Sequence, residues 1–229
     1  MTPSSIGESL LALHHGLSAL PYDFAYLGGC ALAVLVTDPS ADTIRVTKDI
    51  DVMMDIRSRK QFHEADSLLE KSGFRHDTRD GAPICRWVYN GITVDVLPIS
   101  EDVLGWKSRW FEEALATAHE VNIAGQMIKV VSPPYFIALK LEAFEERGQG
   151  DFLTSTDFED VVCLFNGRET LVDEIIACET LCETLAEKFR RYLRAPDLYD
   201  AVEGFAQTES EPDVRRRHII GAFQIIASH

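Results

Sequence analysis

The run Asp49-Ile50-Asp51-Val52 constrains the fold more than any other stretch of this chain. It opens a segment, 49–56, whose residues are typical of a β-strand. Successive side chains of a strand point to opposite faces, so Asp49 and Asp51 project from one face while Ile50 and Val52 point the other way, into a core. The segment therefore predicts a sheet that carries paired negative charges on one side.

Two neighbouring carboxylates repel each other and are costly to remove from water. A divalent cation between them would remove that cost. Mg²⁺ is the natural candidate, because it takes oxygen ligands and commonly binds one or two carboxylates together with substrate phosphates. The alternative is an edge strand with one face in water, and an Asp-x-Asp pair alone does not decide between the two interpretations.

A diglycine precedes this strand. Phe24 to Leu27 is a short apolar run that predicts a strand, Gly28-Gly29 follows it, and residues 30–35 predict a buried helix. Glycine lets the backbone approach a phosphate closely, and the start of a helix offers free N–H groups to an anion. The alternative is an ordinary turn between a strand and a helix.

A third carboxylate follows a predicted hairpin. Asn90-Gly91 separates two strand-like runs, 84–89 and 92–97, and this dipeptide is a strong hairpin signal. Asp95 is a charge within the second, apolar run, so it needs either a partner or a metal ion. A structural salt bridge to Arg86 or Arg45 is the alternative to a metal site.

The remaining periodicity divides the chain near Ser132. Before it, we expect helices, a short strand and a second hairpin, over 5–19, 58–72, 74–77 and 119–131. After Ser132 the apolar residues recur with a helical period. We expect one helix to begin at Ser132, and further helices over about 157–166, 170–194, 197–207 and 213–227. The expected domains are therefore 1–131 and 132–229.

Composition limits the classes of function. The 229 residues include 37 acidic and 22 basic ones, for a net charge of −15, which opposes nonspecific binding to nucleic acid. The five cysteines are odd in number and lack Cys-x-x-Cys spacing, which indicates reduced thiols in a cytoplasmic protein. No apolar run reaches the roughly 18 residues that a membrane-spanning helix needs.

Together, these motifs resemble a known superfamily. Gly28-Gly29, then Asp49-x-Asp51, then Asp95 on a later strand is similar to the pattern of nucleotidyltransferases related to DNA polymerase β, over about residues 24–100. The resemblance implies an α+β fold. In that fold, a mixed β-sheet of the nucleotidyltransferase type is flanked by helices, and a C-terminal helical bundle follows it.

A weaker resemblance extends to about residue 165. The Thr-x-Asp-Ile-Asp form is most similar to the abortive-infection AbiEii-type toxins, as are three later features: Lys140-Leu141-x-Ala143, Arg147 and Asp157-x-x-Asp160. This resemblance implies a toxin-like enzyme, an RNA or tRNA end as the acceptor, and a cognate antitoxin as a possible partner.

The resemblance also implies a mechanism, which is metal-assisted transfer of a nucleoside monophosphate from a nucleoside triphosphate to a hydroxyl group. Asp49 and Asp51 would bridge two Mg²⁺ ions, and Asp95 would ligate one of them and accept the hydroxyl proton. Gly28 and Gly29 would bind the terminal phosphates. Lys48 and Lys140 are candidates to neutralise phosphate charge.

The sequence is compatible with more than one acceptor for the nucleoside monophosphate. Basic clusters at 57–60, 188–191 and 215–217 would suit RNA if they lined one groove, although such clusters are more often solvated helix faces. The acidic balance favours a cationic small molecule such as an aminoglycoside. A third alternative is a protein that keeps the fold and binds nucleotide without turnover.

Overall fold

A computed structural model describes residues 6–38, 49–206 and 212–229. These residues form two compact units. The first comprises 6–33 and 49–132, and the second comprises 34–38, 133–206 and 212–229. Among the residues described, no helix combines the length and apolar character that crossing a lipid bilayer requires.

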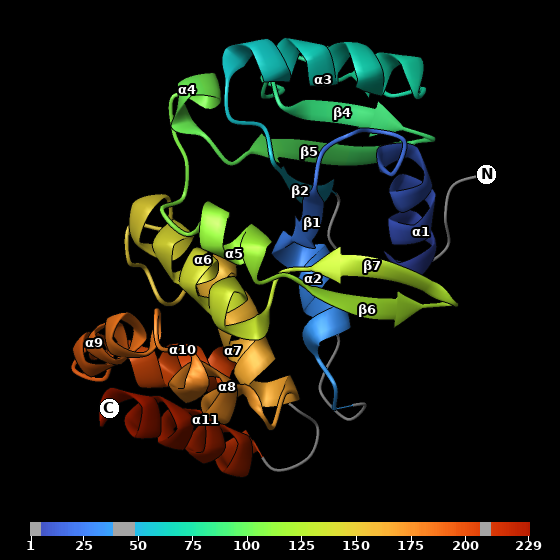
Figure 1. Ribbon diagram of the computed structural model, residues 1–229. Helices are drawn as coiled ribbons and strands as arrows, with labels where there is room; N and C mark the ends of the chain where they lie inside the picture. The colour runs from blue at the N-terminus through green and yellow to red at the C-terminus, as the bar shows by residue number, and fades with distance from the viewer. Residues whose placement is uncertain (1–5, 39–48, 207–211) are drawn as a thin grey trace. The chain divides into compact units, whose positions relative to one another are not determined.

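The described strands of the first unit form one mixed sheet of seven, in the order β3-β4-β5-β2-β1-β7-β6 (Figure 1). The pairs β2–β5 and β1–β7 are parallel, and the other neighbours are antiparallel. The strands are β1 (Phe24–Leu27), β2 (Asp49–Met54), β3 (Arg75–His76), β4 (Arg86–Tyr89), β5 (Ile92–Pro98), β6 (His119–Ile123) and β7 (Gln126–Val130). The expected mixed sheet is confirmed.

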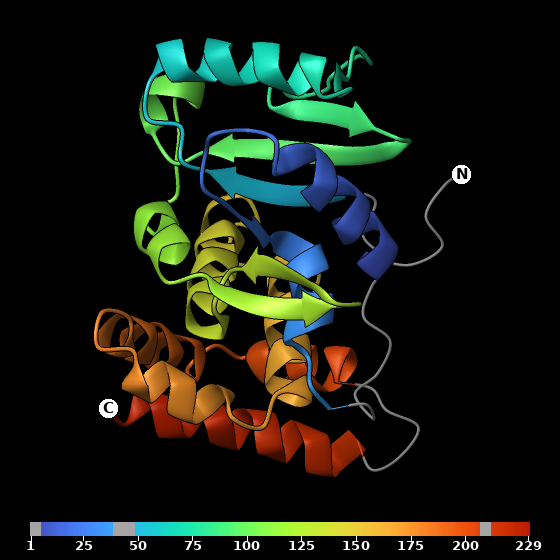
Figure 2. The same cartoon turned by 45° about the vertical axis from the view of Figure 1, so that its right-hand side comes forward.

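Apolar side chains of one helix pack on a face of the sheet. Helix α1 (Ile6–Leu17) crosses the sheet in Figure 2, and its fully buried side chains Leu10, Leu13 and Leu17 follow the spacing of one helical face. Each such leucine contributes about 1.5–3 kcal/mol of burial free energy. The Tyr26 hydroxyl of β1 donates a hydrogen bond to the Leu10 carbonyl at 3.3 Å, which fixes the helix on the strand.

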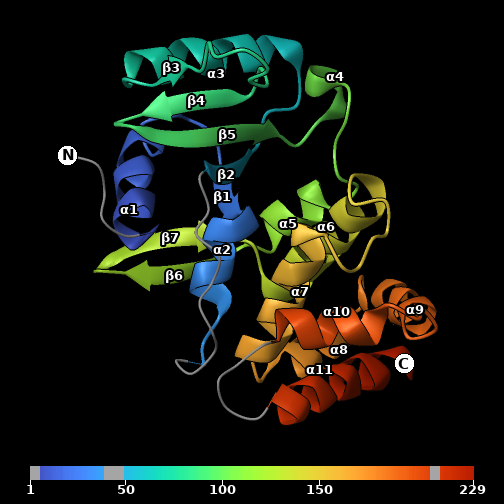
Figure 3. The ribbon, with the colours of Figure 1, turned by 180° about the vertical axis from the view of Figure 1, so that it is seen from behind.

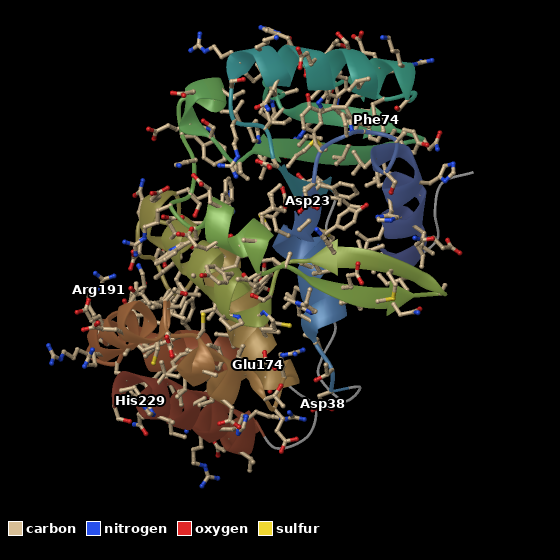
Figure 4. The ribbon with its side chains drawn as sticks, viewed as in Figure 1. Asp23, Asp38, Phe74, Glu174, Arg191 and His229 are labelled. Carbon is tan, nitrogen blue, oxygen red and sulfur yellow. The ribbon has the colours of Figure 1, made fainter. Side chains whose placement is uncertain are left out.

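Helix α3 (Arg59–Lys71) packs at the β3–β4 end of the sheet. Ser58 caps it by accepting a hydrogen bond from the Gln61 backbone N–H, and Gly73, at a φ of 93°, follows its last turn. Phe74, labelled in Figure 4, then stacks on Tyr89 with ring centroids 4.3 Å apart. This stacking holds the end of α3 against β4.

The hairpin predicted at Asn90-Gly91 is confirmed. Asn90 and Gly91 have φ values of 50° and 83°, which is the left-handed pair that a two-residue turn of type I′ requires. Tyr89 therefore pairs with Ile92, and counting back along both strands places Arg86 opposite Asp95. The turn thus fixes which residue faces the third carboxylate.

The second unit is helical. It contains α6 (Pro133–Glu146), α7 (Thr156–Gly167), α8 (Leu171–Ala177), α9 (Cys182–Tyr192), α10 (Leu198–Phe205) and α11 (Pro212–Ala227). Helix α11, red in Figure 3, contacts α7, α8, α9 and α10. Phe223 of α11 stacks on Phe189 at 4.6 Å and meets Phe165 edge-on at 4.9 Å, so aromatic rings form the centre of the bundle.

One expectation about helices is wrong, and two short helices were not expected. The single helix expected over 170–194 is two helices, because the chain turns between Cys178 and Leu181 and buries Leu181 completely. The periodic spacing of apolar residues continues across this turn, so the sequence pattern does not reveal that the helix is interrupted. The sequence does not predict the short helices α4 (Glu101–Leu104) and α5 (Phe111–Ala116), because neither is long enough to show a helical period.

Candidate active site

Three carboxylates lie on adjacent strands of the first unit. Asp49 and Asp51 come from β2 and Asp95 from β5, and these two strands are parallel, with Asp51 directly opposite Asp95. Ile50 and Val94, which are also opposite each other, are buried on the other face. The alternation of strand side chains therefore places all three acidic side chains on one face of the sheet.

A glycine lies against one of these carboxylates. Strand β1 pairs with β2 so that Leu27 faces Asp51, and helix α2 (Gly28–Leu35) begins at the next residue without a loop. Gly28 has a φ of +67°, and a Cβ at this position would come within 1.9 Å of Asp51 Oδ2. A side chain here would be strained by the backbone conformation and would displace the Asp51 carboxylate. The phosphate-binding role of Gly28 and Gly29 stays a prediction.

An arginine joins two of the three carboxylates. Arg86 donates from Nε to Asp95 Oδ1 at 2.8 Å and from Nη2 to Asp95 Oδ2 at 2.7 Å, and the same Nη2 donates to Asp49 Oδ2 at 3.0 Å. The hydrogen bonds to Asp95 raise the pKa of Arg86 further, so the group stays charged. Of the two partners that the sequence offered for Asp95, the structure shows Arg86, while Arg45 lies outside the described residues.

Two buried cysteines lie close to the acidic residues. Cys30 donates its thiol hydrogen to the Leu27 carbonyl at 3.0 Å. Burial and the charge of Asp51 raise the pKa of the Cys30 thiol, and burial and the charge of Asp95 raise that of Cys85 to about 11. Both thiols are therefore protonated at neutral pH, which excludes them as nucleophiles there.

The oxygens of the three carboxylates are suitable ligands for a hard divalent cation, but two of the carboxylates are paired with Arg86. Carboxylate oxygens are the ligands that Mg²⁺ prefers. Within the described part of the chain, however, no three histidine, cysteine, aspartate or glutamate side chains gather closely enough to hold a metal ion. Arg86 already engages Asp49 and Asp95, so a cation could share these oxygens only if the guanidinium moved.

Of the two lysines that are candidates for phosphate binding, the structure describes only one. Lys48 lies outside the described residues. Lys140, in the second unit, is buried with its Nζ 3.1 Å from Asp157 and 2.5 Å from Asp160. Burial would lower the pKa of Lys140, but the two carboxylates outweigh it and raise that pKa. The contact of Lys140 with phosphate stays a prediction.

Arg147 completes this second cluster. It forms a two-pronged ion pair with Asp157, through Nε and Nη2 at 2.8 Å each. The residues singled out by the AbiEii-type resemblance, Lys140, Arg147, Asp157 and Asp160, therefore form one ionic network inside the helical unit. For these four residues, the structure shows ion pairs with one another.

Comparisons with known proteins bear on the fold. The sequence matches no family model and no curated protein. Among solved structures, it is similar to an antigenic nucleotidyltransferase-like protein from Paracoccidioides brasiliensis, with 22% identity, a TM-score of 0.50, and coverage of 90% of this chain and 94% of that one.

Two structures of the antibiotic-resistance factor ANT(2'')-Ia are less similar. The solution structure shares 15% identity at a TM-score of 0.43, over 70% of this chain and 84% of that one. The crystal structure in complex with adenylyl-2''-tobramycin shares 16% at 0.38, over 62% and 79%. The likeness to the Paracoccidioides protein, together with the mixed sheet and the helices around it, shows that this chain has a nucleotidyltransferase fold.

Proposed function

We propose that this protein is a Mg²⁺-dependent nucleotidyltransferase, which moves a nucleoside monophosphate from a nucleoside triphosphate to a hydroxyl group of an acceptor. One observation carries the proposal. Asp51 faces Asp95 across two parallel strands, Asp49 lies on the same face, and Gly28 leaves its Cβ space to the Asp51 carboxylate. Three acidic side chains on one face of a sheet are unfavourable unless cations accompany them, and Arg86 supplies only one positive charge.

Each residue of the site has a part in this proposal. Asp49, Asp51 and Asp95 would hold Mg²⁺, which when bound neutralises phosphate charge and lowers the pKa of the acceptor hydroxyl. The backbone of Gly28 and Gly29, at the start of α2, would bind the phosphates through N–H groups. Gly28 also sets the position of Asp51, because the two residues are in direct contact.

A small cationic molecule is the acceptor that the charges favour. The net charge is −15, and the basic clusters that would suit RNA are largely paired with carboxylates. These ion pairs join Arg57 to Asp55 and Glu112, Lys60 to Glu64, Lys188 and Arg191 to Glu145, Arg215 to Asp38, and Arg216 to Glu203 and Asp213. Arg191 and Asp38 are labelled in Figure 4. Paired cations attract a phosphate backbone less than free ones do.

The AbiEii-type resemblance supports a different acceptor, an RNA or tRNA end. In that version the protein is a cytoplasmic toxin, and a cognate antitoxin neutralises it. Expression without the antitoxin would then stop growth, and the Asp51→Asn variant would be tolerated.

A second candidate function is nucleotide binding without turnover. The ion pairs of Arg86 with Asp49 and Asp95 favour it, because a permanent guanidinium would occupy oxygens of two of the three carboxylates and keep a metal ion away from them. A protein of this kind would bind a nucleoside triphosphate and leave it intact.

One experiment separates these functions. The protein is incubated with each labelled nucleoside triphosphate, Mg²⁺, and either total tRNA or a panel of aminoglycosides, with Asp51→Asn as the inactive control. Label on the aminoglycoside supports a small cationic molecule as the acceptor. Label on tRNA supports the RNA acceptor and the toxin-like function. Tight nucleotide binding without transfer to any acceptor overturns the enzyme in favour of the silent binder.

A further inference from the structure

Arg86 lies where a cation held by Asp49 and Asp95 would lie. A single nitrogen, Nη2, is 2.7 Å from Asp95 Oδ2 and 3.0 Å from Asp49 Oδ2, so the two carboxylates converge on one positive group. The side chain of Asp95 is 11% exposed and that of Arg86 is 25% exposed, so water screens this pair only in part. The chain itself thus supplies one positive charge to the site, which offsets part of its negative charge.

The backbone at Arg86 is fixed, but its side chain can leave. The Asn90-Gly91 turn sets the pairing of Arg86 with Asp95, and the hairpin holds that pairing. Beyond Cβ, the arginine side chain has several rotatable bonds with alternative staggered rotamers. The guanidinium can therefore withdraw from the carboxylates without a change in the sheet.

We propose that Arg86 and a divalent cation compete for Asp49 and Asp95. The inference rests on the proposed function, because it takes these carboxylates to be metal ligands. An oxygen that binds Mg²⁺ lies about 2.1 Å from the ion, and a guanidinium at hydrogen-bond distance from the same oxygens would then bring two positive charges into near contact. The cation binds only when Arg86 has withdrawn.

This competition lowers the apparent affinity of the site for the cation. Only the fraction of molecules with Arg86 withdrawn is competent, and the apparent dissociation constant increases by the inverse of that fraction. Arg86 is therefore a positioning residue. It keeps the carboxylates together and offsets part of their charge while the site lacks metal, and it sets the cation concentration at which the site fills.

The test is a calorimetric titration with Mn²⁺ alone, without nucleotide, on the full chain. Arg86→Gln keeps a polar side chain of similar length and removes the charge, and we expect it to bind Mn²⁺ about tenfold tighter than the wild type, or more. Arg79→Gln is the matched control. Arg79 is an exposed arginine of the same unit that pairs with Asp77, and its replacement is expected to leave the affinity unchanged.

Arg86→Lys provides a second variant in case the first does not fold. It keeps the charge but lacks the two-pronged geometry, so an intermediate affinity is expected. A measurement on the wild type itself needs no variant. The Arg86 Nε–H resonance should shift when Mg²⁺ is added, while that of Arg79 should not.

The outcomes separate the inference from the proposed function. If the wild type and both Arg86 variants bind Mn²⁺ equally and Asp51→Asn abolishes binding, the competition is refuted and the metal site stands. If neither the wild type nor Arg86→Gln binds Mn²⁺, the metal-dependent function itself fails, and the competition fails with it.

Discussion

The carboxylate of Asp51 lies against the backbone of Gly28, so closely that a Cβ on residue 28 would come within 1.9 Å of Asp51 Oδ2. This contact joins the strand that carries two acidic residues to the first residue of α2. The diglycine and the aspartates are therefore parts of one local structure, although Gly28 and Asp51 are 23 positions apart in the chain.

Gly28→Ala should destabilise the protein by about 2–4 kcal/mol, because the new Cβ both strains a φ of +67° and displaces Asp51. The measurement is urea unfolding, together with transfer activity. Gly125→Ala is the control, because Gly125 has a φ of +91° but no atom within 4 Å of its built Cβ. Equal losses in the two variants would show that strain alone operates at residue 28.

Asp51→Asn should reduce nucleotidyl transfer at least about a hundredfold and leave the fold intact, since it removes one negative charge from a site built to hold a cation. Initial rates and circular dichroism check both parts. Asp55→Asn, at a half-buried aspartate that pairs with Arg57, should retain wild-type activity. Normal turnover by the Asp51 variant would remove this residue from the mechanism.

Lys140→Met should cost about 3–5 kcal/mol of stability, because it leaves the carboxylates of Asp157 and Asp160 buried with their shared cation gone. Denaturant unfolding gives the value. Lys129→Met, which breaks an ion pair at a side chain 38% exposed, should cost no more than about 1 kcal/mol. An equal loss of unfolding free energy in the two variants would show that Lys140 does not stabilise the buried carboxylates of Asp157 and Asp160.

Asp157 should make the stability of the protein depend on pH in the acid range. Burial opposes its ionisation, but hydrogen bonds from Arg147 and the charge of Lys140 outweigh burial and lower its pKa below the ordinary 3.8. Because the folded pKa is the lower one, this stabilisation is complete above the unfolded pKa and is lost as pH falls through the folded value.

The comparison of unfolding free energies at pH 7, 5, 4 and 3 tests this sign. The wild type should lose stability more steeply than Asp157→Asn between pH 5 and pH 3, by at most about 1.4 kcal/mol per pH unit for one group. Parallel curves for the two proteins would show that Asp157 titrates normally.

The sequence predicts much of the first unit because its signals are local. Alternation in 49–54 fixes the faces of β2, and Asn90-Gly91 fixes both the hairpin and the pairing of Arg86 with Asp95. Gly28 follows the same logic, since a positive φ between a strand and a helix favours glycine. The helical unit shows the limit of local signals, because a continuous apolar period concealed the turn at Cys178–Leu181.

By itself, the sequence determined the strands, the two-residue turn, and the face on which each aspartate projects, because these depend on neighbours within a few residues. Only the tertiary structure decided that β2 and β5 lie side by side, which brings Asp49 to the arginine that the turn had already placed opposite Asp95. The physical reason is that strand adjacency depends on burying apolar faces from distant parts of the chain, and no local pattern encodes it.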